Sequence, residues 1–194
     1  MKIGIIGAME IEVAEIKESM ENIIETQISN TTYYEGTIHG KNVVVAKSGV
    51  ADLVISDFVV EHDMDTSALG DPVGFISGLD IIKIPCAAHV VEKIKTAAES
   101  LENTNVFVGT IASGDQFICS ENQKNHIVNN FDALCAEMEG AAIGHVCYLN
   151  SVDFCIVRAM SDKADGSAHM DFPSFVKIAA KKSTQLINNY LKSI

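Results

Sequence analysis

The stretch ALCAEMEGAAIGHVCYLNSVDFCIVRAMS, residues 133–161, predicts a strand, a helix and a second strand in direct succession. Its first six residues are a short apolar run, its middle (139–149) is rich in small residues, and its last part (153–161) is apolar again. A strand that leads through a helix into another strand is typical of α/β domains. This segment therefore decides the fold class.

The same alternation extends over most of the chain. A buried first strand is expected at 2–7 and a helix at 10–22, and residues 31–49 read as a hairpin. We expect one α/β domain over residues 1–194, in three layers, with one mixed β-sheet flanked by helices. Further strands are predicted at 52–60 and 105–113, and further helices at 85–101, 122–131 and 171–194.

Composition narrows the class of protein. The chain has 194 residues, of which 47% are hydrophobic, and a formal net charge of −12 without a Lys/Arg cluster. Such an acidic chain is a poor candidate for binding nucleic acid. No apolar run approaches the roughly 18 residues of a membrane helix, and no secretory signal is evident, so we expect a cytoplasmic protein.

The five cysteines are odd in number and form no CxxC pair. Most lie in apolar surroundings, which suits small core residues in a reducing compartment. No pair of Cys or His has a finger-type spacing, so we expect no metal site.

Charged residues gather where predicted strands end. Glu12 follows the first strand, Glu137 and Glu139 close the strand at 133–138, and Arg158, Ser161 and Asp162 close the strand at 153–161. Ligands of open α/β sheets bind at the carboxyl ends of the strands. We therefore expect these side chains to form one polar site.

Each of these residues also has an ordinary structural interpretation. Glu12 and Glu139 could stabilise helix N-termini, where the dipole favours anions. Asp162 could cap a helix, and Met9 and Met138 could fill the core. The loop GIIGAM at 4–9 is not GxGxxG, so no dinucleotide site is predicted.

Five motifs follow one another along the chain: MKIGIIGAMEIEV, VVVAKSGV, VGTIASGDQFI, AEMEGAAIGHVC and VRAMSDKAD. In combination, they resemble those of the 5′-methylthioadenosine/S-adenosylhomocysteine nucleosidase family, in the purine nucleoside phosphorylase superfamily. The resemblance implies a phosphorylase/hydrolase-like fold and hydrolysis of an N-glycosidic bond in methionine salvage. It also implies that the products are adenine and a thioribose sugar, and that the reaction needs no metal or organic cofactor.

The resemblance also assigns roles. Asp162 would protonate the adenine leaving group and Glu12 would activate water, a division of acid and base between two carboxyl groups that glycosidases also use. Glu139 would accept hydrogen bonds from the ribose, with Arg158 orienting it. The remaining expected contacts are Met138 beside the sugar, Phe117 and Ile118 at the purine, Ser161 beside Asp162, and Met9, Val50 and Phe172 at the alkylthio group.

The chain departs from the family pattern after Val50. KSGV (47–50) runs directly into ADLVISD (51–57), where the family has a helix, a central strand and a glycine-rich loop. The resemblance implies a homodimer that binds an adenine nucleoside. Two other readings stay open: a nucleoside phosphorylase, and an inactive nucleoside-binding or dimerisation protein.

Overall fold

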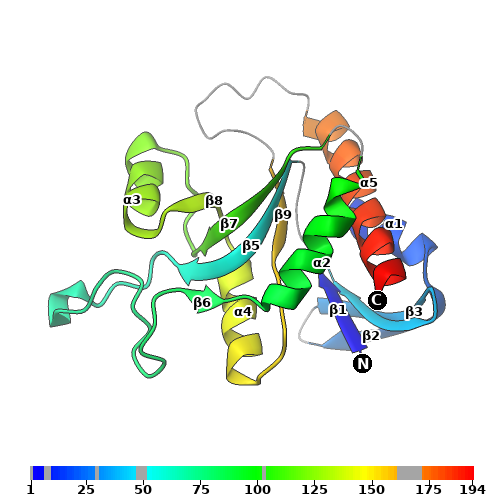
Figure 1. Cartoon of the computed structure of the whole chain (residues 1–194), viewed down its shortest axis with the longest axis horizontal. Helices are drawn as coiled ribbons and strands as arrows, with labels where there is room; N and C mark the ends of the chain where they lie inside the picture. Colours follow the sequence, from blue (N-terminus) through cyan, green and yellow to red (C-terminus); the bar gives the residue numbers. More distant parts are fainter. Residues whose placement is uncertain (1, 7–9, 29–30, 47–51, 102–103, 161–171) are drawn as a thin grey trace.

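The structure is a computed structural model that describes residues 2–6, 10–28, 31–46, 52–101, 104–160 and 172–194. Its strands form two separate β-sheets, and its helices pack around these sheets (Figure 1). None of the helices in these ranges is long and apolar enough to cross a membrane.

The first sheet has the strand order β1-β4-β3-β2. Strand β1 pairs in parallel with β4, while β4 with β3 and β3 with β2 are antiparallel. The β3–β4 hairpin turns at His39 and Gly40, whose φ angles of 48° and 74° suit the tight two-residue turn that matches strand twist. The elements of this half are β1 (Lys2–Ile6), α1 (Glu10–Glu18), β2 (Glu21–Ile28), β3 (Thr31–Ile38) and β4 (Lys41–Ala46).

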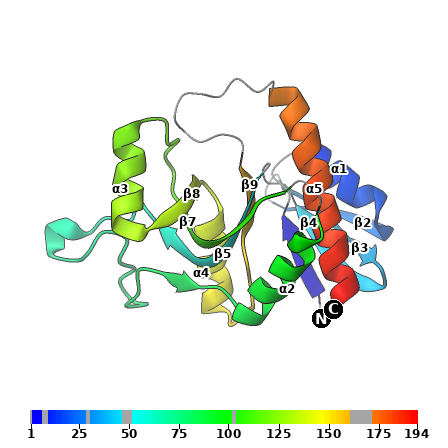
Figure 2. The ribbon, with the colours of Figure 1, turned by 45° about the horizontal axis from the view of Figure 1, so that its top comes forward.

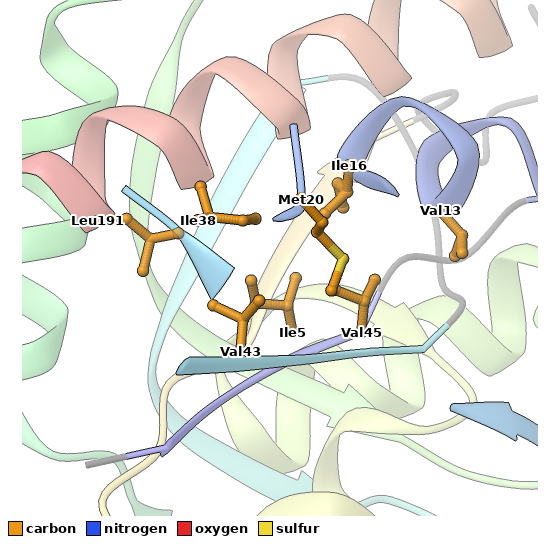
Figure 3. Close-up of a cluster of buried hydrophobic side chains, with 8 residues drawn as sticks. All are labelled: Ile5, Val13, Ile16, Met20, Ile38, Val43, Val45 and Leu191. Carbon is orange, nitrogen blue, oxygen red and sulfur yellow. The ribbon is translucent and has the colours of Figure 1, made fainter. Parts of the chain in front are cut away.

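The hydrophobic core beside the first sheet lies between this sheet and the helices α1 and α5. Side chains from β1, α1, β3 and β4 meet Leu191 of α5 (Phe172–Ser193), so the last helix is tied to the first sheet (Figure 3). The buried members are Ile5, Val13, Ile16, Met20, Ile38, Val43, Val45 and Leu191.

The second sheet is built around β5 (Asp52–Glu61). One edge of β5 pairs in parallel with β7 (Val106–Ser113), which in turn pairs in parallel with β8 (Ala133–Glu137). The other edge pairs antiparallel with β9 (Val157–Met160) along its first half and with β6 (Ile84–Pro85) further on.

Helices cover both faces of this second sheet. Leu53 and Ile55 of β5 pack with residues of α2 (Ala88–Glu99) and α5, whereas Val54 and Val59 pack with Ala141 of α4 (Gly140–Leu149). Alternate side chains of a strand point to opposite faces, and a register shift between Ser56 and Val59 returns Val59 to the face of Val54, so α2 and α4 lie on opposite sides of the sheet (Figure 2). A further helix, α3 (Glu121–Phe131), packs near β8, and η1 (Ser67–Leu69) lies in the long loop before β6.

This arrangement confirms the predicted α/β layers and mixed strands, with three differences. The strands form two sheets instead of one. The first helix ends at Glu18, and β2 follows it where no strand was predicted. Strand β1 is not a buried strand, since Lys2 and Gly4 are exposed. The last difference has a physical reason: β1 pairs with β4 and with no other described strand, so it forms the edge of its sheet.

Candidate active site

Glu139 and Arg158 are brought together from two different elements. Glu139 directly precedes α4, and Arg158 lies in β9. An Nη2–Oε2 distance of 2.6 Å joins them. The same Arg158 nitrogen lies 2.7 Å from Oε2 of Glu137, at the end of β8. One guanidinium, from the second residue of β9, therefore binds two carboxylates beside the end of β8.

The two carboxylates differ sharply in exposure. The side chain of Glu137 is 7% exposed and that of Arg158 14%, whereas Glu139 is 54% exposed. Two cations would be needed to neutralise both carboxylates, and Arg158 is the chain's only arginine. Glu139 thus presents a fixed, partly solvated hydrogen-bond acceptor, which suits a ligand with hydroxyl groups.

Glu137 is held by the start of α4. Its carboxylate accepts the backbone N–H of Gly140 at 2.9 Å and of Glu139 at 3.2 Å, where the helix dipole also favours an anion. It further accepts the hydroxyl of Ser113, whose oxygen in turn accepts the N–H of Ala141 at 2.6 Å. A Cβ at position 140 would lie 3.1 Å from a Glu137 carboxylate oxygen and 2.9 Å from Ile156, so glycine allows this close packing.

Ser113 was not among the predicted site residues, and Glu137 was expected at its strand end but was given no role of its own. Their contribution depends on burial and on contacts between β7, β8 and α4, which the sequence does not display. The signal that could have revealed the role of Glu137 is its place at the last position of a strand that runs directly into a helix N-terminus, because a carboxylate there can meet free backbone N–H groups.

The loop with Phe117 and Ile118 begins at the same strand ends. The N–H of Gly114 donates to the carbonyl oxygen of Glu137 at 3.2 Å. Phe117 is 77% exposed, whereas Ile118 is partly buried against the cluster around Phe131. An exposed aromatic ring on such a loop could stack on a flat, apolar ligand group. Met138, between the two glutamates, is 45% exposed.

A cleft of about 620 Å³ opens beside this cluster. Glu137, Glu139 and Arg158 line one part of it, and the rest is lined by residues of β1, α2, α4 and α5 and by residues 152–157, which lead into β9. Its volume is in the range of small-molecule binding sites. Within the described ranges, no group of three or more His, Cys, Asp or Glu side chains is placed to hold a metal ion.

The other predicted residues cannot be joined to this cluster by observed contacts. Met9, Val50, Ser161 and Asp162 lie outside the described residues, and Glu12 and Phe172 are placed only as members of α1 and α5.

His62 directly follows β5 and lies next to Gly114, at the start of the loop that carries Phe117. It is only 5% exposed, and its Nε2 has no hydrogen-bond partner among the described residues. A Cβ at Gly114 would lie 2.6 Å from this nitrogen, so only glycine fits there. Burial lowers the pKa of His62 from its ordinary value of 6.5; the nearby His126 also lowers it, while Asp63 and Glu137 oppose the shift.

The sequence and the structure of the chain are similar to the same group of known proteins. The family model of the phosphorylase superfamily matches residues 49–192. The 5′-methylthioadenosine/S-adenosylhomocysteine nucleosidase of Shewanella sp. (strain W3-18-1) is 33% identical over 231 aligned positions, which cover 100% of both chains. This alignment exceeds the chain's own 194 residues by 37 positions, so the relative has a residue at these positions and this chain has none.

Two solved structures are similar over their full length. The nucleosidase of Campylobacter jejuni has a TM-score of 0.92 and 30% identity, with 100% of each chain covered. The nucleosidase of Neisseria meningitidis, in complex with methylthio-immucillin-A, has a TM-score of 0.89 and 29% identity, with 100% of this chain and 99% of that chain covered. These likenesses confirm the phosphorylase/hydrolase-like α/β fold.

Because Glu137 is buried and Glu139 is exposed, replacing each of them by Gln should lower the free energy of unfolding by different amounts. Glu137→Gln removes the buried carboxylate that Arg158, Ser113 and the N–H of Gly140 all bind, and should lower the free energy of unfolding by about 2–4 kcal/mol, because several buried charge-assisted hydrogen bonds are lost. Glu139→Gln should cost less than about 1 kcal/mol, since exposed pairs contribute little. Urea unfolding of both variants measures this, and equal losses would contradict the assigned roles.

The lowered pKa of His62 predicts a loss of stability in acid. The unfolded chain takes up the proton near pH 6.5, before the folded chain does. The contribution of neutral His62 to the free energy of unfolding is therefore fully present above that pH, and it is lost as the pH falls from there through the lower pKa of the folded protein. His62→Phe should flatten the acid side of the stability profile in urea unfolding between pH 7.5 and 5, whereas His89→Gln, at an exposed position, should not. Parallel profiles for wild type and His62→Phe would refute this.

Proposed function

The chain belongs to the 5′-methylthioadenosine/S-adenosylhomocysteine nucleosidase family of the phosphorylase superfamily, and we propose that the cluster around Arg158 binds the ribose of its substrate. The reaction is hydrolysis of the N-glycosidic bond of 5′-methylthioadenosine or S-adenosylhomocysteine, a step of methionine salvage. It releases adenine and the thioribose sugar.

The observation that carries the ribose assignment is the pairing of Glu139 with Arg158. The carboxylate is partly exposed on the cleft and can accept hydrogen bonds from two neighbouring hydroxyls. Arg158 cannot rotate freely, because buried Glu137 fixes it from the other side. A preorganised acceptor strengthens its interaction as the ribose gains positive charge in the transition state.

Asp162 and Glu12 complete the proposed chemistry. Asp162 follows β9 by two residues and protonates the adenine leaving group, with Ser161 holding its carboxyl group. Glu12 is the third residue of α1 and positions and deprotonates the attacking water. Two carboxyl groups on opposite sides of the scissile bond allow acid and base to act in one displacement.

The remaining contacts follow the parts of the nucleoside. Met138 packs beside the sugar, Phe117 stacks on the purine, and Ile118 offers backbone groups to the adenine edge. Met9, Val50 and Phe172 line the pocket of the alkylthio group. The exposure of Phe117 and Met138 supports the first two assignments.

We also propose a cytoplasmic homodimer in which residues 1–194 act as one domain. All five cysteines are free, which suits a reducing compartment. Val146 and Leu149 of α4 and the nearby Val152 are each more than half exposed, and an apolar group of this kind suits a subunit contact.

The geometry argues against a phosphorylase. Phosphorolysis needs an anion site, and the only arginine is already bound to two carboxylates. A phosphate at this position would also meet the negative charges of Glu137 and Glu139.

Adenine release from methylthioadenosine tests the proposal. Wild-type protein should release adenine at equal rates with and without phosphate. Asp162→Asn and Glu12→Gln should each lower kcat by about 10²–10⁴-fold, the contribution of a positioned acid or base. Asp80→Asn, at an exposed loop position, is the matched control and should keep the wild-type rate.

Two outcomes would contradict this account. Folded wild-type protein that releases no adenine would refute hydrolysis by this chain. Release that depends on phosphate would identify a phosphorylase instead.

A further inference from the structure

The loop of residues 114–120 connects β7 to α3 and carries Phe117. Its far end is anchored locally, because the Ser120 hydroxyl accepts the N–H of Gln123 at 3.3 Å and caps α3. Phe117 itself is 77% exposed, so packing does little to fix its ring. The position of the ring therefore depends on what holds the start of the loop.

The end of β5 holds the start of this loop. The backbone N–H of His62 donates to the carbonyl oxygen of Ser113 at 2.9 Å. Beside this bond, Oδ2 of Asp63 accepts the N–H of Asp115 at 2.7 Å. These two bonds enclose Gly114, where a Cβ would lie 2.6 Å from Nε2 of His62 and 2.7 Å from the Asp63 carboxylate. Glycine thus allows the loop to lie directly against the end of β5.

Strand β8 holds the same turn from the opposite side. In the sheet, β7 lies between β5 and β8, and the N–H of Gly114 donates to the carbonyl oxygen of Glu137 at 3.2 Å. The carboxylate of Glu137 binds Arg158, which in turn binds Glu139. The start of the loop and the cluster around Arg158 are therefore both fixed to Glu137, so the position of Phe117 relative to Glu139 depends on this turn.

We propose that Asp63 is a positioning residue for adenine recognition, because its carboxylate fixes the start of the loop that places Phe117 against the purine. This role rests on the proposed function, in which Phe117 stacks on the purine and Glu139 accepts the ribose hydroxyls. Asp63 acts through the N–H of Asp115 and not on the nucleoside. A carboxylate suits this role, since hydrogen bonds to a charged acceptor are stronger than neutral ones. Binding residues on loops are commonly positioned by a rigid scaffold in this way.

Asp65 provides a matched comparison within the same chain. Like Asp63, it is exposed, and its Oδ1 accepts a backbone N–H, that of Ser67, at 2.8 Å. That bond closes a turn in the loop that follows β5, and it does not involve residues 114–120. Removing each carboxylate therefore deletes the same kind of contact, and only one of the two deletions affects the loop of Phe117.

Steady-state hydrolysis of methylthioadenosine tests this role. Asp63→Ala should raise KM by about three- to tenfold, the effect of losing one hydrogen bond, and should change kcat by less than about twofold. The reason is that a displaced Phe117 weakens purine binding equally in the ground state and in the transition state. Asp63→Asn keeps an oxygen acceptor and should recover most of the affinity, whereas Asp65→Ala should keep the wild-type KM. All three variants should melt close to the wild-type temperature, because both positions are exposed.

Two further measurements need no turnover. Amide hydrogen exchange of the ligand-free protein should be faster at residues 114–118 in Asp63→Ala than in wild type, and unchanged there in Asp65→Ala. Titration calorimetry with adenine should show a Kd raised by the same factor as KM in Asp63→Ala alone. These readouts separate the role of Asp63 from the hydrolysis itself, since wild-type protein that binds adenine without releasing it from the nucleoside would contradict hydrolysis only.

Three results would overturn the role of Asp63. The first is wild-type exchange at residues 114–118 in Asp63→Ala, which would show that the carboxylate does not hold the loop. The second is faster exchange there while adenine binds the variant as tightly as wild type, or binds neither, which would separate the loop from purine recognition. The third is a lowered kcat with an unchanged KM, which would place Asp63 in the chemical step.

Discussion

The guanidinium of Arg158 joins a buried carboxylate to an exposed one, and the candidate site is organised around this contact. Glu137 is fixed by Ser113 and by the first N–H groups of α4. Arg158 is fixed by Glu137, and Glu139 is fixed by Arg158. The N-terminus of α4 therefore fixes Glu137, Arg158 and Glu139 in turn, and Glu139 lies at the cleft. A buried ion pair contributes little net stability, but it holds geometry when its hydrogen bonds are satisfied.

The position of β9 links this cluster to the sheet. Pairing with β5 places Arg158 opposite Val54, and its guanidinium binds Glu137 at the end of β8. Val157 and Arg158 of β9 also line the cleft, as do residues 2–4 of β1. The same strand thus supplies the central side chain of the site and part of the cleft wall.

Much of the fold follows from local sequence. Strand β5 and helix α2 are apolar runs with clear periods, and they form where predicted. Strand β2 was missed because its side chains at residues 21–26 are all exposed, so no alternation of apolar and polar residues marks the strand. The division into two sheets could not be predicted, because it depends on which strands become neighbours.

The candidate site was predictable to a similar degree. The sequence places Glu139 and Arg158 at strand ends, and the structure brings them to 2.6 Å. The sequence also places Glu137 at a strand end, but it does not reveal the role of this residue, which comes from burial and from contacts to Arg158, Ser113 and the start of α4. Asp162 and Glu12 were inferred from residue type and family likeness, and their contribution stays a prediction.

The most direct test of the central claim is a crystal structure of the protein with methylthioadenosine bound to Asp162→Asn. We expect a Glu139 carboxylate oxygen within about 2.6–3.2 Å of a ribose hydroxyl, the range of a hydrogen bond, with Arg158 still between both glutamates. A nucleoside bound elsewhere, or bound with its ribose away from Glu139, would contradict the account.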